Sequence, residues 1–157
     1  MNQKFFDGKV PALGELEDID RATIEELANF PARIGEAIEN YRFREAVALM
    51  LDLARLGNKY LADTQPWHTI KTDPKRVETI LNIALQITAS LSIVVEPILP
   101  FTAEKITKQL GMSTHQWNEA GRIDLLAAGH QINQAELLFE KIEDSVIQQQ
   151  VDKLLNA

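Results

Sequence analysis

The sequence predicts an all-α protein, an antiparallel helical bundle followed by a C-terminal helix. Three observations support this prediction. Apolar residues recur at spacings of three and four over long stretches, which is the period of one helix face. The alternation of apolar and polar residues that is typical of strands is nearly absent. Prolines and glycines fall mostly between the periodic stretches, where helices end.

Composition places the chain among globular proteins. Its 157 residues fit one domain, and 45 % of them are hydrophobic. The chain has no cysteine, which excludes disulfides and thiolate metal sites and fits a cytoplasmic location. The first residues show no signal-peptide pattern. The longest uncharged run, from Thr79 to Val95, is shorter than the ~20 apolar residues that span a bilayer, so we expect no membrane contact.

The N-terminal third is expected to contain a lead-in and a first helix. Residues 1–19 are rich in turn-forming glycine and proline and are expected to be extended. A helix begins near Asp20, because apolar residues follow at helical spacing. Pro31 is expected to kink or divide this helix, since proline lacks an N–H and clashes with the preceding turn.

Two further helices follow with a loop between them. The second helix, about Arg44 to Ala62, carries two adjacent apolar stripes and should be mostly buried. It ends before Pro66, so the segment Thr64–Thr72 is expected to be a loop. Asp73 and Pro74 form an N-cap and first position for the third helix. The third helix has no charge over much of its length and is therefore expected at the centre of the bundle.

The last third predicts two shorter helices. Residues Pro100–Leu110 form a fourth helix with Gly111 as its C-terminal cap. The periodicity weakens beyond Met112, and a last helix covers roughly Glu143 to Leu155, laid against the bundle. The predicted organisation is thus a lead-in at 1–19, a bundle at 20–142 and a C-terminal helix at 143–157.

No pattern of catalytic residues is evident. The glycines are scattered and form no phosphate-binding loop. His68, His115 and His130 are isolated from one another, and none belongs to a paired metal-ligand motif. We therefore expect no catalytic residue, no bound metal and no cofactor in this chain, whose function would be to hold another molecule.

Charge limits what that molecule can be. The net charge of −7 argues against a general nucleic-acid binder, whose affinity comes from many phosphate contacts. A protein that reads a few unpaired bases by stacking and hydrogen bonding needs less basic surface. The charge therefore disfavours RNA binding without closing the question.

One residue favours such a role. A tryptophan taken alone is more often a packing anchor than a ligand site, which is how we interpret Trp117. Trp67, however, lies in the proline-bounded loop, beside Pro66, His68 and Lys71, which are not typical of a core. A rigid indole held near solvent would suit stacking on an unpaired base.

At this loop the chain resembles the anticodon-binding domain of methionyl-tRNA synthetase, a class I aminoacyl-tRNA synthetase. The resemblance rests on ARLGNKYLADTQPW at residues 54–67, in which Asn-x-Tyr is followed by Pro-Trp. The apolar helix, EPILPFT at 96–102, then Gly-His at 129–130 and LFEKIE at 138–143 follow in the family's order. The resemblance thus covers nearly the whole chain and implies the helical bundle of this domain type.

The resemblance also implies roles for individual residues. Trp67 corresponds to the family's tryptophan that stacks on the anticodon, and Pro66 to the neighbour that shapes the contact. His68 and Lys71 are candidate phosphate or base neighbours by proximity alone. Asn58 and Tyr60 match the motif but are expected to be mainly structural. The spacing places Asn58 on a partly buried line of its helix, where it would hydrogen-bond the loop.

The family's catalytic domain lies upstream and binds ATP and methionine. Its His-x-Gly-His and Lys-Met-Ser-Lys-Ser signatures are absent here, so the chain resembles a C-terminal fragment. The resemblance implies ATP and Mg for that catalytic domain and leaves Zn open. The partners implied are methionine tRNA and the catalytic domain of the same polypeptide. An Asn-x-x-x-Arg pair that contributes to anticodon binding is also missing, since the first residues look like the cut end of its helix. We therefore expect weak RNA binding by the chain alone.

Two alternatives remain open at this stage. One is a helical protein-interaction module without an RNA role, in which Trp67 would contact a protein partner or anchor the core. The other is the equivalent domain of another class I synthetase, such as those for valine, isoleucine, leucine or cysteine. The Pro-Trp loop disfavours the second alternative.

Overall fold

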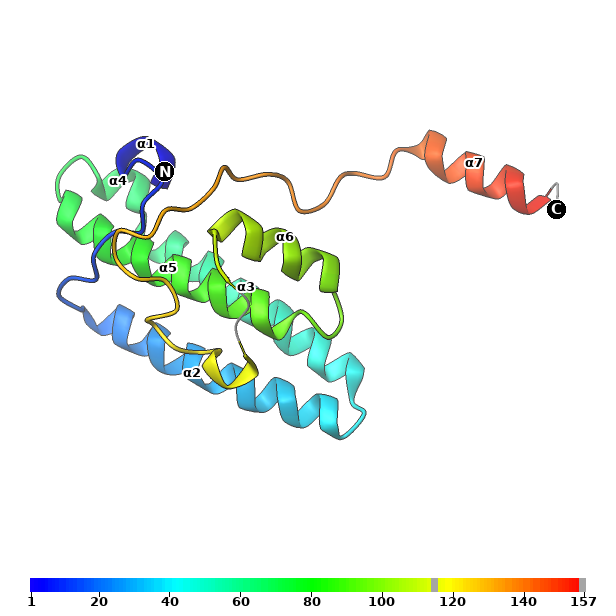
Figure 1. Ribbon diagram of the computed structural model, residues 1–157, viewed down its shortest axis with the longest axis horizontal. Helices are drawn as coiled ribbons and strands as arrows, with labels where there is room; N and C mark the ends of the chain where they lie inside the picture. The colour runs from blue at the N-terminus through cyan, green and yellow to red at the C-terminus, as the bar shows by residue number, and fades with distance from the viewer. Residues whose placement is uncertain (114–115, 156–157) are drawn as a thin grey trace.

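The computed structural model describes residues 1–113 and 116–155 and shows an all-helical chain (Figure 1). No strand forms among these residues; a single antiparallel bridge pairs Lys9 with Gln131. The helices, in order, are α1 Asn2–Phe5, α2 Asp18–Glu39, α3 Phe43–Thr64, α4 Pro66–Thr69, α5 Pro74–Val94, α6 Pro100–Leu110, the 3-10 turn η1 Trp117–Glu119 and α7 Asp144–Leu155. The predicted fold class is confirmed.

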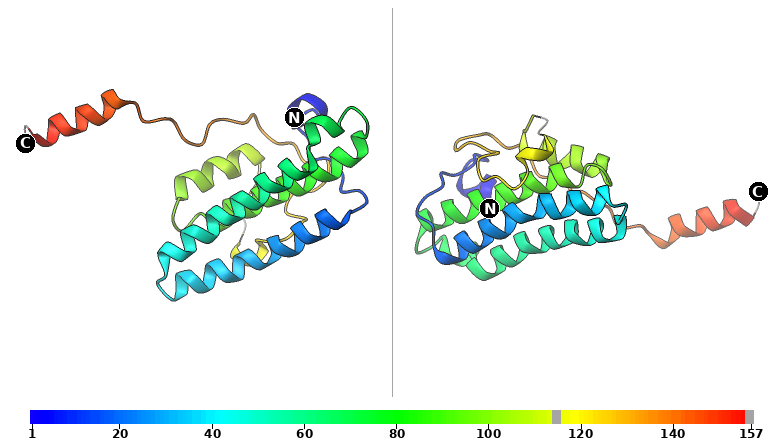
Figure 2. Two further views of the ribbon diagram at one scale, coloured as in Figure 1. Left: turned by 180° about the vertical axis from the view of Figure 1, so that it is seen from behind. Right: turned by 90° about the horizontal axis from the view of Figure 1, so that it is seen from below.

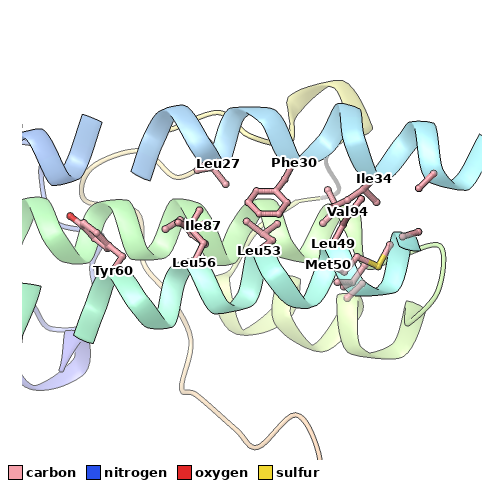
Figure 3. Packing of buried hydrophobic residues seen from close by; sticks show 14 of the residues in the cluster. Leu27, Phe30, Ile34, Leu49, Met50, Leu53, Leu56, Tyr60, Ile87 and Val94 are labelled. Atoms are coloured by element: carbon pink, nitrogen blue, oxygen red, sulfur yellow. The ribbon is translucent and has the colours of Figure 1, made fainter. Parts of the chain in front are cut away.

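Helices α2, α3 and α5 form the centre of the bundle and run antiparallel to their neighbours in sequence (Figure 2). Their apolar stripes meet in one core. Figure 3 shows the inward-facing side chains, with Phe30 of α2 opposite Leu53 of α3 and with Tyr60 near one end. α6 packs on α5 in a smaller cluster built around Ile106 and Leu110.

Helix α5 is the central helix, as expected from its lack of charge. By length and composition it could cross a membrane, but 72 % of its most apolar window is buried inside the bundle. Its polar residues Asn82, Gln86 and Ser90 are buried too, one turn apart. They bond irregular segments of the chain: Asn82 donates to the Pro11 carbonyl, and Ser90 accepts from the Gly121 N–H. These polar groups therefore attach the lead-in and the 121–126 segment to the core.

Two predictions about local structure are wrong. Pro31 does not divide its helix, since α2 is continuous from Asp18 to Glu39. Leu27 and Phe30 before the proline and Ile34 after it are all buried, so packing holds both halves in one helix despite the lost hydrogen bond. The loop predicted at Thr64–Thr72 contains the one-turn helix α4, because proline is well suited to a first helical position.

The C-terminal helix forms but does not lie against the bundle. α7 stands apart at the end of an extended segment (Figure 1), and none of its residues is buried. The expectation that it packs back on the bundle is therefore wrong. Its apolar side chains Val146, Ile147 and Val151 remain exposed, because no other part of the described chain reaches them. The division of the chain at 19/20 and 142/143 remains a prediction.

Candidate nucleic-acid interface

Trp67 lies on α4, at one end of the bundle between α3 and α5 (Figure 1). Its side chain is 47 % exposed, whereas the neighbouring Pro66 is buried. The indole contacts the ring of His68 edge to face, with 6.2 Å between ring centroids. One side of this turn is therefore fixed in the protein, and the other presents an aromatic ring to solvent.

Backbone geometry makes the turn rigid. α3 ends at Gln65, whose φ of 45° lies in the left-handed region that residues with a side chain rarely adopt. This reversal allows Pro66 to start α4 at once. The Thr69 hydroxyl lies 3.2 Å from the carbonyl oxygens of both Thr64 and Gln65 and donates to them. Neither the proline nor the hydrogen-bonded turn leaves the Trp67 backbone much freedom.

The two helices that flank the turn are joined by a buried ion pair. The Arg76 guanidinium at the start of α5 donates two hydrogen bonds to the Asp20 carboxylate, at 2.6 and 2.8 Å. The Tyr60 hydroxyl in the last turns of α3 donates to the same carboxylate at 2.6 Å. Asp20 in the first turn of α2 thus links the end of α3 to the start of α5. The segment that carries Trp67 is held at both of its ends.

The electrostatics of this network follow from burial and pairing. Burial alone would raise the pKa of Asp20, but its hydrogen bonds to Arg76, Tyr60 and the Glu17 N–H lower that pKa below its ordinary value. Burial and the bond to Asp20 raise the pKa of the Tyr60 phenol, so Tyr60 stays neutral. Arg76 also lies 3.1 Å from the Glu17 carboxylate. The network is a structural support rather than a reactive centre.

The structure places the other predicted site residues as follows. His68 and Lys71 are exposed on the same segment as Trp67. Asn58 is exposed as well, and no hydrogen bond of its side chain is found among residues 1–113 and 116–155, so the prediction of a partly buried residue that bonds the loop is wrong. The helix is turned so that Gly57 and Leu61 take that position. Tyr60 is buried, as a structural residue should be.

Trp117 packs against the core in its partly buried 3-10 turn, which confirms its interpretation as a packing residue. His130 bonds the Leu110 carbonyl at 2.8 Å and helps to hold the end of α6. His115 lies outside the described residues. Among the described residues, no three histidine or acidic side chains come together as they would around a metal ion.

Sequence reasoning missed the Asp20–Arg76–Tyr60 network. Asp20 was read only as a residue near a helix start, and nothing local to it indicates a partner. The one available signal is its combination with Arg76: each lies in the first turn of a helix, and one helix separates the two. In an antiparallel bundle this places both residues at the same end.

The fold and the site define the class of protein: a helical bundle of the type found in aminoacyl-tRNA synthetases. The apo form of Mycobacterium tuberculosis methionyl-tRNA synthetase matches with a TM-score of 0.80 at 23 % identity, over 91 % of this chain and 30 % of that one. The same organism's synthetase in complex with methionyl-adenylate matches with a TM-score of 0.79 at 24 % identity, over 90 % of this chain and 28 % of that one. At such identities the likeness shows the fold alone.

Sequence comparison gives the particular family. The family described as the anticodon binding domain of methionyl tRNA ligase matches residues 10–155, and the chain belongs to it. A methionine–tRNA ligase of Phocaeicola vulgatus is 57 % identical over 99 % of this chain and 23 % of its own length. One from Cytophaga hutchinsonii is 56 % identical over 98 % of the chain and 22 % of its own. The chain therefore spans about a quarter of these relatives and matches the methionine family rather than the other synthetases considered.

Proposed function

We propose that the chain recognises the anticodon of methionine tRNA, and that Trp67 stacks on an anticodon base that has left the loop's own stack. The observation that supports this most directly is the half-exposed indole on a turn whose Pro66 is buried. A ring held in place before RNA arrives loses little conformational entropy on stacking. Pro66 shapes the contact by fixing the direction in which α4 begins.

The neighbouring polar residues complete the proposed site. His68 and Lys71 are exposed beside the indole and are suited to phosphate or base contacts. Asn58, exposed on α3 and not engaged with the loop, is a weaker candidate for a hydrogen bond to a base edge. With a net charge of −7, the chain would rely on stacking and a few polar contacts rather than on a broad basic surface.

We propose further that this domain belongs to a complete methionine–tRNA ligase in the cytoplasm. Its relatives are ligases of which it covers only 23 %, and their remaining length would supply the catalytic domain with ATP, methionine and Mg, and with Zn where the family uses it. Binding of the anticodon here would set the register of the tRNA, so that its acceptor end reaches the catalytic domain.

The proposal is tested with Trp67→Ala and Trp67→Phe in the full-length ligase. Loss of the indole should weaken binding of methionine tRNA by ~1–3 kcal/mol, the usual range for one stacked base. Phenylalanine should retain part of the affinity, because it keeps a ring. Discrimination between native and anticodon-changed tRNA should fall in parallel.

Trp117→Phe is the matched control, since Trp117 packs against the core and would not meet RNA. It should alter stability without altering discrimination between the tRNAs. If Trp67→Ala charges native and anticodon-changed tRNA in the same ratio as the unchanged enzyme, the stacking role is wrong.

A further inference from the structure

The end of the bundle opposite α4 carries an apolar surface that the described residues leave uncovered. We call it the end patch. It consists of residues in the α2–α3 connection, along the outer side of α3 and at the start of α6: Tyr41, Phe43, Val47, Leu51, Leu99 and Phe101. Their exposed fractions run from 38 % for Val47 to 82 % for Tyr41. Both connections lie at the same end of the bundle, away from Trp67 (Figures 1 and 2).

Tyr41 adopts a conformation that does not serve the stability of the fold. α2 ends in a Schellman motif, in which the Tyr41 N–H donates to the Ile38 carbonyl and the Arg42 N–H to the Ala37 carbonyl. The residue at the turn has a φ of 60°, a position where glycine is strongly preferred. Here a tyrosine occupies it, and its ring is 82 % exposed, touching Phe43 edge to face. Strain accepted without burial indicates a ring kept for contact with another molecule.

The surface around Phe101 is shaped to receive side chains. A groove of about 610 Å³ lies between the end of α5 and α6 and is lined in part by Ile93, Phe101, Ala103 and Met112. Phe101, 79 % exposed, forms one wall. The combination of an apolar groove and projecting aromatic rings is typical of the centre of a protein–protein interface.

Charge excludes RNA as the partner of this surface. Glu96 and Glu104 line the groove, and Glu36 and Glu45 flank Arg42, with which both form ion pairs. Phosphates would be repelled there. A protein surface with an apolar centre and mixed charges at its rim would fit.

The size of the relatives points to the occupant. The chain covers 23 % of the Phocaeicola vulgatus ligase, so most of that protein lies outside it. α7, whose apolar residues are also exposed, extends past the same end of the bundle as the end patch (Figure 1; Figure 2, right). A domain docked at this end could contact the end patch and α7 together.

We propose that the end patch is the surface on which the catalytic part of the ligase packs. The inference rests on the proposed function, which makes the chain one domain of a ligase. Trp67 and the end patch then lie at opposite ends of the rigid helix pair α3 and α5. A helix of 22 residues such as α3 is about 33 Å long, so the bundle would act as a spacer between anticodon and catalytic domain.

Thiol labelling tests the proposal directly, because this chain has no cysteine of its own. Phe101→Cys and Tyr41→Cys are labelled in the chain alone and in the full-length ligase, and the labelled peptides are identified by mass. Both sites should react several-fold more slowly in the ligase. Leu13→Cys is the control: Leu13 is also exposed, beside the first turns of α5 at the Trp67 end, and should react equally in both. Equal rates for Phe101→Cys and Tyr41→Cys in both proteins would overturn the proposal.

A second pair of variants tests the consequence for charging. Tyr41→Gly should raise the Tm of the chain alone by about 2 °C, because glycine adopts the turn conformation without strain. In the ligase, Tyr41→Gly combined with Phe101→Ser should lower the rate of tRNA charging. Activation of methionine and affinity for the anticodon stem-loop should stay unchanged.

The outcomes separate this inference from the proposed function. If Trp67→Ala leaves tRNA binding intact while Phe101→Cys is protected in the ligase, the anticodon proposal fails and the docking surface stands. If the patch variants weaken anticodon binding and no protection is seen, the patch binds RNA and the docking proposal is wrong.

Discussion

Arg76 and Asp20 form a bidentate ion pair across 56 positions of sequence, and this pair fixes the end of the bundle that carries Trp67. Asp20 is fully buried, and the Arg76 side chain is only 11 % exposed. A buried pair of this kind gives little net stability over an apolar pair of the same shape. Its value lies in geometry, since the carboxylate can satisfy Arg76 and Tyr60 only when the ends of α3 and α5 are in register.

Removing one partner should therefore be costly. Asp20→Asn keeps the shape of the side chain but leaves the Arg76 guanidinium buried without a counter-charge. We expect the free energy of unfolding to fall by about 3 kcal/mol, measured by urea denaturation. The matched control is Asp124→Asn, which breaks the exposed pair with Arg122 and should change stability little. Equal losses in the two variants would contradict the structural role of the buried pair.

The same pair should make stability depend on acid pH. The pKa of Asp20 is lowered in the folded protein from its ordinary value of 3.8. The unfolded chain therefore binds a proton on Asp20 at a higher pH than the folded one does. The stabilisation is fully present above about pH 4 and is lost as the pH falls through the folded-state pKa. Thermal melts between about pH 6 and about pH 2.5 should show a smaller acid-induced loss for Asp20→Asn than for the unchanged protein.

Most of the fold could be predicted because helical periodicity and proline placement are local signals. Residues Pro100–Leu110 and the N-cap at Asp73 were predicted as the structure shows them, since the capping side chain accepts from the Arg76 N–H only three residues away. Pro31 was misjudged because tertiary packing on both sides of it, which no local rule contains, outweighs one lost hydrogen bond.

The site was predictable only in part. Trp67 was singled out by its proline-bounded loop, and its exposure meets the geometric condition for stacking. Asn58 was misplaced because a small error in helix phase moves a residue from a buried line to an exposed one. The Asp20–Arg76 pair and the end patch depend on which helix ends meet in space, and no single segment encodes that.

The polar residues of α5 provide a third prediction. Gln86 is buried and bonds Leu126 twice, accepting from its N–H and donating to its carbonyl. Gln86→Leu would leave both backbone groups without a partner, so we expect a loss of about 2–4 kcal/mol in unfolding free energy. Thr88→Ala is the control, because Thr88 bonds only the Ala84 carbonyl within its own helix. A loss no larger than that of the control would mean that the 121–126 segment is held by its apolar contacts.

The turn at Gln65 leads to the fourth prediction. Its left-handed backbone costs energy with any side chain that has a Cβ, and glycine removes this cost. Gln65→Gly should therefore stabilise the chain by about 0.5–1 kcal/mol in urea denaturation, whereas Gln65→Ala, which keeps the Cβ, should not. The two variants should also differ in RNA binding. Glycine permits other conformations between α3 and α4, so the indole of Trp67 would be less well fixed before binding.

Affinity of the full-length ligase for methionine tRNA should accordingly fall with Gln65→Gly although the fold is more stable, and should hold with Gln65→Ala. Opposite changes in stability and affinity within one variant would separate the rigidity of the turn from the integrity of the fold. If both variants bind tRNA as the unchanged ligase does, Pro66 and the Thr69 hydrogen bonds suffice to orient Trp67, and the strained residue has no part in recognition.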